Sequence, residues 1–171
     1  MEVHKTYLAL GSNLGDRRSF LSQAVHEIGT QIGELITCSK FYRTAPLNPE
    51  NISSQPEFLN AVLLCETTLN PMELLTTALR IETNLGLDRV AKTHWGPRII
   101  DIDILTYDDA LVSEPNLIIP HKEMHNRDFV LVPLKEISPD FVHPKSKKSI
   151  SELIDDLKTK GAYTHMIATL E

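Results

Sequence analysis

Hydrophobic positions along the chain recur with two different periods, which separate predicted strands from predicted helices. Runs of branched and small apolar residues, bounded by Gly, Pro, Asn or Ser, are typical of strands. They occupy residues 5–10, 35–43, 58–67 and 99–106. Two other segments carry apolar residues three and four positions apart, as amphipathic helices do. The first follows Asp16 and ends near Ile32, and the second opens at Asn70 and ends near Leu85, before Gly86.

The order of these elements predicts the fold class. Strand, helix, strand, strand, helix, strand matches the ferredoxin-like βαββαβ unit, an α+β fold with a four-stranded antiparallel sheet backed by two helices on one face. The C-terminal part contains a proline-rich connection at 115–120 and a predicted helix over 150–157, so we expect additional short helices there. A length of 171 residues suits one domain, and we expect residues 1–171 to form it.

Two irregular stretches interrupt the pattern. Residues 44–56 contain three prolines, and residues 87–97 contain Arg89, Lys92, His94 and Trp95. Neither stretch fits a helix or a strand. Long irregular segments in compact domains are often functional, so we expect both to border a site.

Composition and charge exclude several classes of function. The net charge of -6 disfavours general nucleic-acid binding. No apolar run approaches the roughly 18 to 20 residues that span a bilayer, and the apolar part of the N-terminus is too short for a signal peptide. We therefore expect a cytoplasmic protein with no membrane or nucleic-acid partner, and we take a monomer as the expectation.

Asp101 and Asp103 are the clearest candidates for chemistry. They alternate with Ile100, Ile102 and Ile104, so both carboxylates point to the face of the strand opposite the isoleucines. Two neighbouring carboxylates repel each other, and aspartate is a poor strand former. The pair is either a solvated sheet face or a site for hard cations, which take oxygen ligands. Arg98, just before the pair, favours a phosphate-rich ligand bridged by Mg²⁺.

Three further clusters surround this pair. Trp95, followed by Gly, Pro and Arg98, indicates either a loop anchored by a buried indole or a lid that carries cations over a triphosphate. His121, which follows a proline, has Arg127 nearby in the sequence. It indicates either a structural histidine or one that contacts phosphate or handles a proton. Gly11 to Gly15 lacks the Gly-Lys-Ser/Thr of a Walker loop, so we interpret it as a tight turn between strand and helix.

Together these blocks resemble the 6-hydroxymethyl-7,8-dihydropterin pyrophosphokinases of folate biosynthesis. The resemblance covers about residues 5 to 157, and the run from Trp95 to Asp103 is its most specific part. The blocks that carry it are Gly11-Ser12-Asn13, Phe41-Tyr42-Arg43-Thr44, Phe58-Leu59-Asn60-Ala61, Glu82, Trp95-Gly96-Pro97-Arg98, Asp101-Ile102-Asp103-Ile104, Pro120-His121 and Asn126-Arg127-Asp128-Phe129-Val130-Leu131.

The resemblance implies an activity and a set of roles. ATP would give its β- and γ-phosphates to the pterin hydroxymethyl group and release AMP, with two Mg²⁺ ions held by Asp101 and Asp103. Catalysis would also involve Arg89 and Arg98. The implied ATP contacts are Leu75, Glu82, Arg98, Ile104, His121 and Arg127. The implied pterin contacts are Thr44, Ala45, Leu47, Phe58, Asn60, Trp95 and Phe129.

The sequence departs from the family pattern in the stretch before Trp95. The family commonly carries two arginines there, whereas this chain has only Arg89, with Lys92 and His94 as the other cations. Lys122 stands where a tyrosine often follows the histidine, and Asn116 where some members have arginine. Ala45 and Asn48 replace a common Pro and Gly. These changes bear on ATP affinity and rate more than on the reaction.

Two other classes of function remain as alternatives. A ligand-sensing module without catalysis would release no AMP and would leave the carboxylate pair unexplained. An RNA-binding module on a similar sheet would need exposed aromatic residues and a basic surface. The outward positions of the last predicted strand are Asp101 and Asp103, which repel phosphate unless a metal intervenes.

Overall fold

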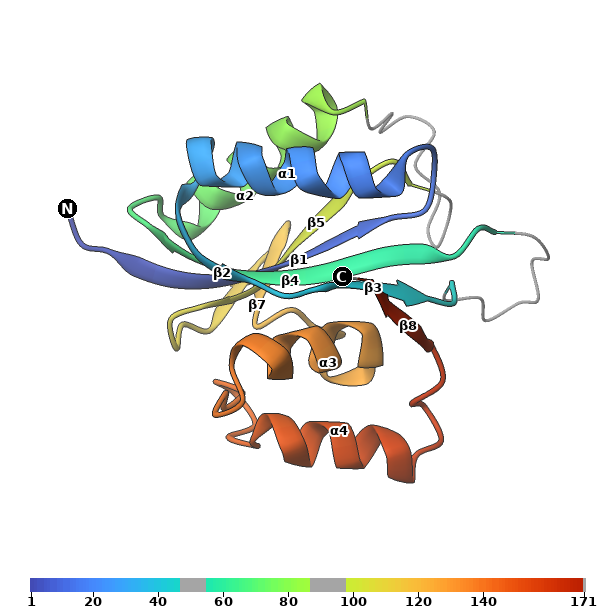
Figure 1. The fold of residues 1–171 in the computed structure, drawn as a ribbon. Coiled ribbons are helices and arrows are strands. Elements are labelled where there is room, and N and C mark those ends of the chain that lie inside the picture. Colours follow the sequence, from blue (N-terminus) through green and yellow to red (C-terminus); the bar gives the residue numbers. More distant parts are fainter. Residues whose placement is uncertain (47–54, 87–97, 171) are drawn as a thin grey trace.

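The computed structural model describes residues 1–46, 55–86 and 98–170, and it has an α+β fold with a central antiparallel sheet (Figure 1). Helices α1 and α2 cover one face of the sheet, and α3 and α4 lie on the other face. Within these ranges the sheet has six strands in the order β5-β1-β4-β3-β8, with β2 also paired to β4. The strands of the sheet are β1 (His4–Ser12), β2 (Gly33–Cys38), β3 (Phe41–Thr44), β4 (Phe58–Thr67), β5 (Asp101–Tyr107) and β8 (Met166–Leu170).

Helices and a small hairpin complete the described part of the chain. The helices are α1 (Arg17–Gln31), α2 (Pro71–Asn84), the 3-10 turn η1 (Met124–Asn126), α3 (Asp128–Ile137) and α4 (Ile150–Thr159). The hairpin is formed by β6 (Val112–Glu114) and β7 (Leu117–Ile119). No helix among these elements is long and apolar enough to cross a membrane.

The predicted caps of the first two helices are confirmed. The Asp16 carboxylate accepts the backbone N–H of Ser19 at 3.0 Å and begins α1. Asn70 forms a capping box with Glu73 and begins α2, with Pro71 in the first turn. Gly86 follows α2 with φ +101°, a conformation that L side chains rarely adopt. These termini are local features, and the sequence alone was enough to place them.

The single strand predicted over 35–43 is wrong. The structure has two strands, β2 and β3, which both pair with β4 and are separated at Ser39 and Lys40. Ser39 donates its backbone N–H to the Val62 carbonyl at 2.9 Å, and its hydroxyl accepts the Val62 N–H at 3.0 Å. The Ser39 side chain therefore occupies a pairing position of β4 that a regular strand would fill with backbone.

The predicted count of four strands and the single layer of helices are also corrected. Strand β8 extends the sheet beyond β3, and α3 and α4 cover the face that the prediction left open. The β8 sequence begins with three consecutive apolar or small residues, so no hydrophobic alternation marks this strand in the sequence. Its pairing with β3 depends on tertiary contacts that local pattern does not encode.

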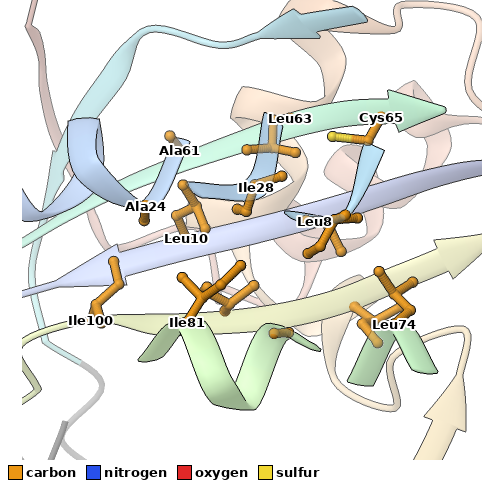
Figure 2. Packing of buried hydrophobic residues seen from close by; sticks show 14 of the residues in the cluster. Leu8, Leu10, Ala24, Ile28, Ala61, Leu63, Cys65, Leu74, Ile81 and Ile100 are labelled. Atoms are coloured by element: carbon orange, nitrogen blue, oxygen red, sulfur yellow. The ribbon is translucent and has the colours of Figure 1, made fainter. Parts of the chain in front are cut away.

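The core has one part on each face of the sheet. Leu8, Leu10 and Leu63 of the sheet pack against α1 and α2, and Ile81 is one of the α2 residues in this cluster (Figure 2). Val62, next to Leu63 on β4, points the other way into the cluster that α3 and α4 close. Because both faces are covered, β4 reads as an almost continuous apolar run. Asn60 of β4 and the two aspartates of β5, Asp101 and Asp103, lie toward one end of the α3 face, and there the site forms.

Candidate active site

A cavity of about 230 Å³ opens at one end of the α3 face of the sheet. Its walls come from β1, β3, β4 and β5, from the segment after β7, and from the start of α3. It brings together many of the residues predicted from sequence. They are Thr44, Ala45, Phe58, Asn60, Arg98, Asp101, Asp103, His121, Arg127 and Phe129.

Three neighbouring strands place the polar groups of the floor in one row. In the sheet register Gly11 of β1 lies opposite Asp101 of β5 on one side and opposite Asn60 of β4 on the other. The Asp101 carboxylate and the Asn60 amide are thus two strand spacings apart, roughly 10 Å. Gly11 keeps the space between them open, since a Cβ there would lie 2.8 Å from the Asn60 Oδ1. The cavity has a carboxylate end and an amide end.

The alternation predicted for the last strand is confirmed. Ile100, Ile102 and Ile104 are buried in the α1–α2 part of the core, with exposed fractions of 0%, 5% and 5%. Asp101 and Asp103 face the cavity, and their side chains keep 18% and 32% exposure. Both carboxylates are therefore partly exposed and line the cavity.

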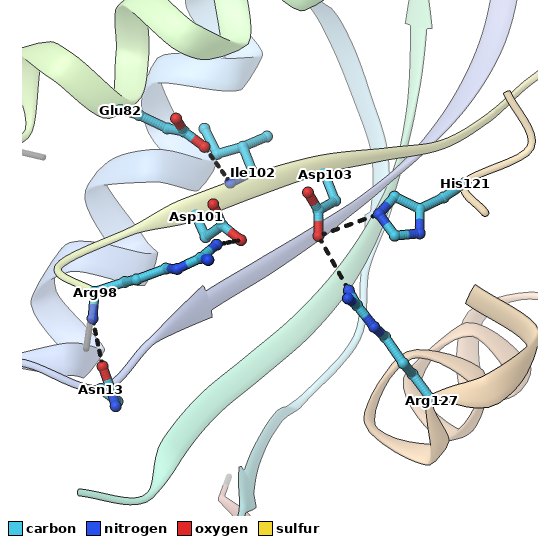
Figure 3. A network of polar contacts seen from close by, with 8 residues as sticks. All are labelled: Asn13, Glu82, Arg98, Asp101, Ile102, Asp103, His121 and Arg127. Atoms are coloured by element: carbon cyan, nitrogen blue, oxygen red, sulfur yellow. Dashed lines mark hydrogen bonds and ion pairs between the residues drawn. The ribbon is translucent and has the colours of Figure 1, made fainter. Parts of the chain in front are cut away.

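The Arg98 side chain pairs with Asp101, and the Arg98 backbone is hydrogen-bonded to Asn13. The Nη1 of Arg98 lies 2.5 Å from the Oδ2 of Asp101 (Figure 3). The Arg98 backbone N–H donates to the Asn13 side-chain oxygen at 2.6 Å, and the Asn13 N–H donates to the Arg98 carbonyl at 2.9 Å. The backbone N–H and the backbone carbonyl of Arg98 are thus both fixed to Asn13, which follows β1.

Asp103 faces a second pair of cationic or neutral donors. The Arg127 Nη1 lies 3.5 Å from the Asp103 Oδ2, and the His121 Nε2 lies 3.8 Å from the same oxygen (Figure 3). The Glu123 backbone N–H donates to the His121 Nδ1 at 3.2 Å, so in the neutral ring the proton sits on Nε2 and points into the site.

His121 is a neutral donor at physiological pH. Burial, reinforced by the positive charge of Arg127, lowers the pKa of His121 to about 4. A neutral imidazole donates a hydrogen bond without adding charge to a site that already holds two arginines. In the ligand-free site, the donors around Asp103 are therefore a charged arginine and a neutral imidazole, and both could turn to an anionic ligand.

The amide end of the cavity is built from β3, β4 and α3. The Asn60 Nδ2 donates to the Thr44 hydroxyl at 2.5 Å, and both side chains are almost fully buried. Phe58 and Phe129 add aromatic surface to the lining, and Ala45 follows the last residue of β3. An amide fixed by one neighbour, in a cavity that two aromatic rings also line, suits a flat heteroaromatic ligand with a polar edge.

Three predicted ATP contacts are not in this cavity. Leu75 and Ile104 pack in the core between the sheet and helices α1 and α2, on the opposite face from Asp103. Glu82, 1% exposed on α2, accepts the backbone N–H of Ile102 at 2.7 Å and so binds the edge strand β5 (Figure 3). These residues lie behind β5, so the structure does not bring them to the carboxylate pair.

Leu47, Arg89 and Trp95 lie outside the described residues, as do Lys92 and His94.

The donor set fits Mg²⁺ bound together with a phosphate ligand. No cluster of three or more His, Cys, Asp or Glu side chains suited to a metal occurs in the described part of the chain. Mg²⁺ commonly uses one or two protein carboxylates and takes its other ligands from water and substrate phosphates. Asp101 and Asp103 supply that number of carboxylates, and the arginines beside them supply charge for the phosphates.

Sequence reasoning missed two contributors to the site. Asn13 belongs to a block that carries the resemblance and to a predicted turn, but nothing in the sequence indicates that its amide fixes Arg98. Asp128 and His165 form a hydrogen-bonded pair behind Phe129. The buried aspartate at a helix start was a weak signal for the second, because nothing in the sequence joins residue 128 to residue 165.

Comparison with known proteins agrees with the geometry. The family model described as 7,8-dihydro-6-hydroxymethylpterin-pyrophosphokinase (HPPK) matches residues 7–139. The 2-amino-4-hydroxy-6-hydroxymethyldihydropteridine pyrophosphokinase of Haemophilus influenzae is 44% identical over 150 residues, which cover 86% of this chain and 89% of that protein. The bifunctional protein FolKE of Lactococcus lactis subsp. lactis is 44% identical over 167 residues, which cover 96% of this chain and 46% of that protein.

Solved structures with the same fold include those described as HPPK-DHPS. The crystal structure of Plasmodium falciparum HPPK-DHPS with pteroate aligns with a TM-score of 0.73 at 17% identity, over 93% of this chain and 43% of that one. The fold and the matches together define a transferase that uses ATP. The chain belongs to the 7,8-dihydro-6-hydroxymethylpterin-pyrophosphokinase family.

Proposed function

We propose that the cavity between Asp101 and Asn60 is where this chain carries out the reaction of its family, the transfer of pyrophosphate from ATP to 6-hydroxymethyl-7,8-dihydropterin. The products are AMP and the pterin diphosphate, in a step of tetrahydrofolate biosynthesis. The main support for the proposal is that Asp101, Gly11 and Asn60 lie opposite one another on three adjacent strands. This register places a carboxylate end and an amide end roughly 10 Å apart on the sheet. ATP phosphates and a pterin ring need those two environments side by side.

The carboxylate end is the proposed phosphate site. Asp101 and Asp103 would hold two Mg²⁺ ions, which neutralise phosphate charge and orient the attacking and leaving oxygens when bound. Arg98, Arg127 and His121 now face these carboxylates and would turn their donors to the ATP phosphates. Arg98 can do so while its backbone stays fixed, since only its side chain contacts Asp101.

The amide end is the proposed pterin site. Phe58 and Phe129 would stack on the ring, and Asn60 would hydrogen-bond to its edge. The contact with Thr44 fixes the rotamer of Asn60 before the ligand arrives. Ala45 would border the same site. The pterin hydroxymethyl oxygen would then point along the sheet toward the phosphates.

The transfer itself would depend on position and charge. The hydroxymethyl oxygen would lose its proton to water and bond to the β-phosphorus of ATP as the bond from that phosphorus to the α–β bridging oxygen breaks, and AMP would leave. The rigid strands β1, β4 and β5 would supply the alignment, and the arginines would stabilise the charge that develops on the phosphate oxygens.

Several expectations stay predictions. Arg89, with Lys92 and His94, would supply the loop cation, while Leu47 and Trp95 would border the pterin. Leu75, Glu82 and Ile104 would contact ATP from the edge of β5. A ferredoxin-like core, one domain over 1–171, a monomer and a cytoplasmic location are also proposals.

One assay tests the proposed function. The purified chain is incubated with ATP, MgCl₂ and 6-hydroxymethyl-7,8-dihydropterin, and AMP and the pterin diphosphate are measured by chromatography. We expect both products in equal amounts, and neither product when EDTA replaces MgCl₂ or when the pterin is omitted. AMP release that does not require the pterin, or no AMP at all, would contradict the proposal.

A further inference from the structure

A buried carboxylate lies directly behind the proposed pterin site. Asp128, the first residue of α3, is 0% exposed. Its Oδ1 accepts the His165 Nδ1–H at 2.9 Å and the Phe129 backbone N–H at 2.9 Å, and its Oδ2 accepts the His165 backbone N–H at 2.7 Å. One carboxylate therefore joins the backbone of Phe129 to both the ring and the backbone of His165.

His165 also contacts the opposite wall of the cavity. Its carbonyl oxygen accepts the Ala45 backbone N–H at 2.8 Å, and its ring meets the Phe129 ring edge-to-face, with centroids 5.8 Å apart and an interplanar angle of 82°. Ala45 and Phe129 both line the cavity. A displacement of His165 would therefore move two separate parts of the wall.

The pair is rigid for an electrostatic reason. Burial raises the pKa of Asp128, but the hydrogen bonds from His165 and Phe129 outweigh burial and hold that pKa below its usual range. A buried carboxylate that loses a donor is costly, so the bonded arrangement is strongly preferred over a loosened one. The position of His165 thus follows that of Asp128.

We propose that His165, held by Asp128, is a positioning residue that sets the width of the pterin site by fixing Phe129 and Ala45 relative to each other. His165 precedes β8 and lies beyond residues 7–139 that the family model matches, so the C-terminal segment completes the site. The inference rests on the proposed function, because it assigns the pterin to this end of the cavity. The contacts of His165 with Asp128, Phe129 and Ala45 all lie at the amide end of the cavity, so we expect its effect to fall on the pterin.

Two substitutions separate the effect of the His165 hydrogen bond to Asp128 from the effect of the His165 ring against Phe129. His165→Phe keeps an aromatic ring against Phe129 and removes the donor to Asp128. His165→Asn removes the ring but places an amide N–H where Nδ1–H was. His26→Ala, at an exposed position of α1, is the control.

The measurements are steady-state KM values for the pterin and for ATP, with thermal unfolding midpoints for each variant. We expect His165→Phe to raise the pterin KM about tenfold and to leave the ATP KM within about twofold. His165→Asn should return the pterin KM to within about threefold of the parent value. His26→Ala should match the parent protein.

Several results would overturn the inference. They are an unchanged pterin KM in His165→Phe, an equal rise in both KM values, or a pterin KM in His165→Asn as high as in His165→Phe. If His165→Phe does not fold, His165→Asn and His165→Gln carry the test. The longer Gln amide replaces Nε2 rather than Nδ1, so equal pterin KM values for these two would also overturn it. Failure of the proposed function would be separate, because the unsubstituted chain would then release no AMP.

Discussion

Asn13 and Arg98 are joined by two hydrogen bonds that run in opposite directions. The Asn13 side-chain oxygen accepts the Arg98 N–H at 2.6 Å, and the Asn13 N–H donates to the Arg98 carbonyl at 2.9 Å. The Asn13 Nδ2 also donates to the Pro56 carbonyl at 3.2 Å. Asn13, 1% exposed, therefore connects two positions that border the irregular stretches of the sequence.

Replacing Asn13 should weaken both the fold and the phosphate site. Asn13→Ala leaves the Arg98 N–H without its acceptor, and we expect the free energy of unfolding in urea to fall by about 1–3 kcal/mol. We also expect kcat/KM to fall about tenfold, because Arg98 loses its fixed position beside Asp101. Gln23→Ala, at an exposed position of α1, is the control and should change neither quantity. Parent-like stability and activity in Asn13→Ala would refute this role.

The carboxylate pair should be required for the metal-dependent step. Asp101→Asn and Asp103→Asn keep the shape of each side chain and remove its charge, so we expect AMP formation to fall at least about a hundredfold in each. The Mg²⁺ concentration for half-maximal activity should rise in whichever variant retains measurable turnover. Asp109→Asn, exposed after β5, should behave as the parent. Full activity at the usual Mg²⁺ concentration in either site variant would remove that residue from the metal site.

Gly11 should be needed for the space between the two ends of the cavity. A Cβ at this position would lie 2.8 Å from the Asn60 Oδ1, so Gly11→Ala should displace the Asn60 amide from the cavity floor. We expect the pterin KM to rise roughly tenfold, with a smaller effect on the ATP KM. Calorimetric titration of the pterin checks the same affinity without turnover.

A second glycine provides the control for Gly11. Gly29 lies in α1 and a Cβ there meets nothing within 4 Å, so Gly29→Ala should keep both KM values. It should also raise the free energy of unfolding by roughly 0.5–1 kcal/mol, as alanine does in helix interiors. If both glycine variants bind the pterin as the parent does, the close approach at Gly11 has no role in binding.

His143 should make the fold sensitive to mild acid. Burial, with smaller effects of the charges on His125 and Lys145, lowers the pKa of His143 below its usual 6.5. The unfolded chain therefore binds more protons between the two pKa values, so this contribution to stability is complete above pH 6.5 and is lost as pH falls. The folded chain needs Nδ1 of His143 unprotonated, because Nδ1 accepts the backbone N–H groups of Lys145 and Ser146 at 3.2 Å each.

The test for His143 is a comparison of slopes. His143→Asn places an amide oxygen where Nδ1 accepts and cannot titrate, so its free energy of unfolding should fall less steeply than that of the parent from pH 7 to pH 5. Urea unfolding at each pH gives both curves. Parallel curves would show that His143 does not carry the acid sensitivity, because other groups titrate equally in both proteins.

Local features of the fold could be predicted because local chemistry sets them. Asp16 and Asn70 begin helices through bonds to residues two or three positions away, and Gly86 ends one through its own backbone. Strands β1 and β4 were predictable from their apolar runs. The split between β2 and β3 was not, because Ser39 makes its deciding bonds with Val62, 23 residues later.

The sequence by itself determined that Asp101 and Asp103 share one face of a strand, since side chains alternate whatever the strand pairs with. It also carried the blocks of residues that identify the family. Only the tertiary structure decided what faces that pair. Sheet register sets Asn60 across Gly11 from Asp101, and Arg127 and His121 reach Asp103 from a separate segment. Contacts between residues far apart in the chain depend on the packing of whole layers, and local pattern does not encode them.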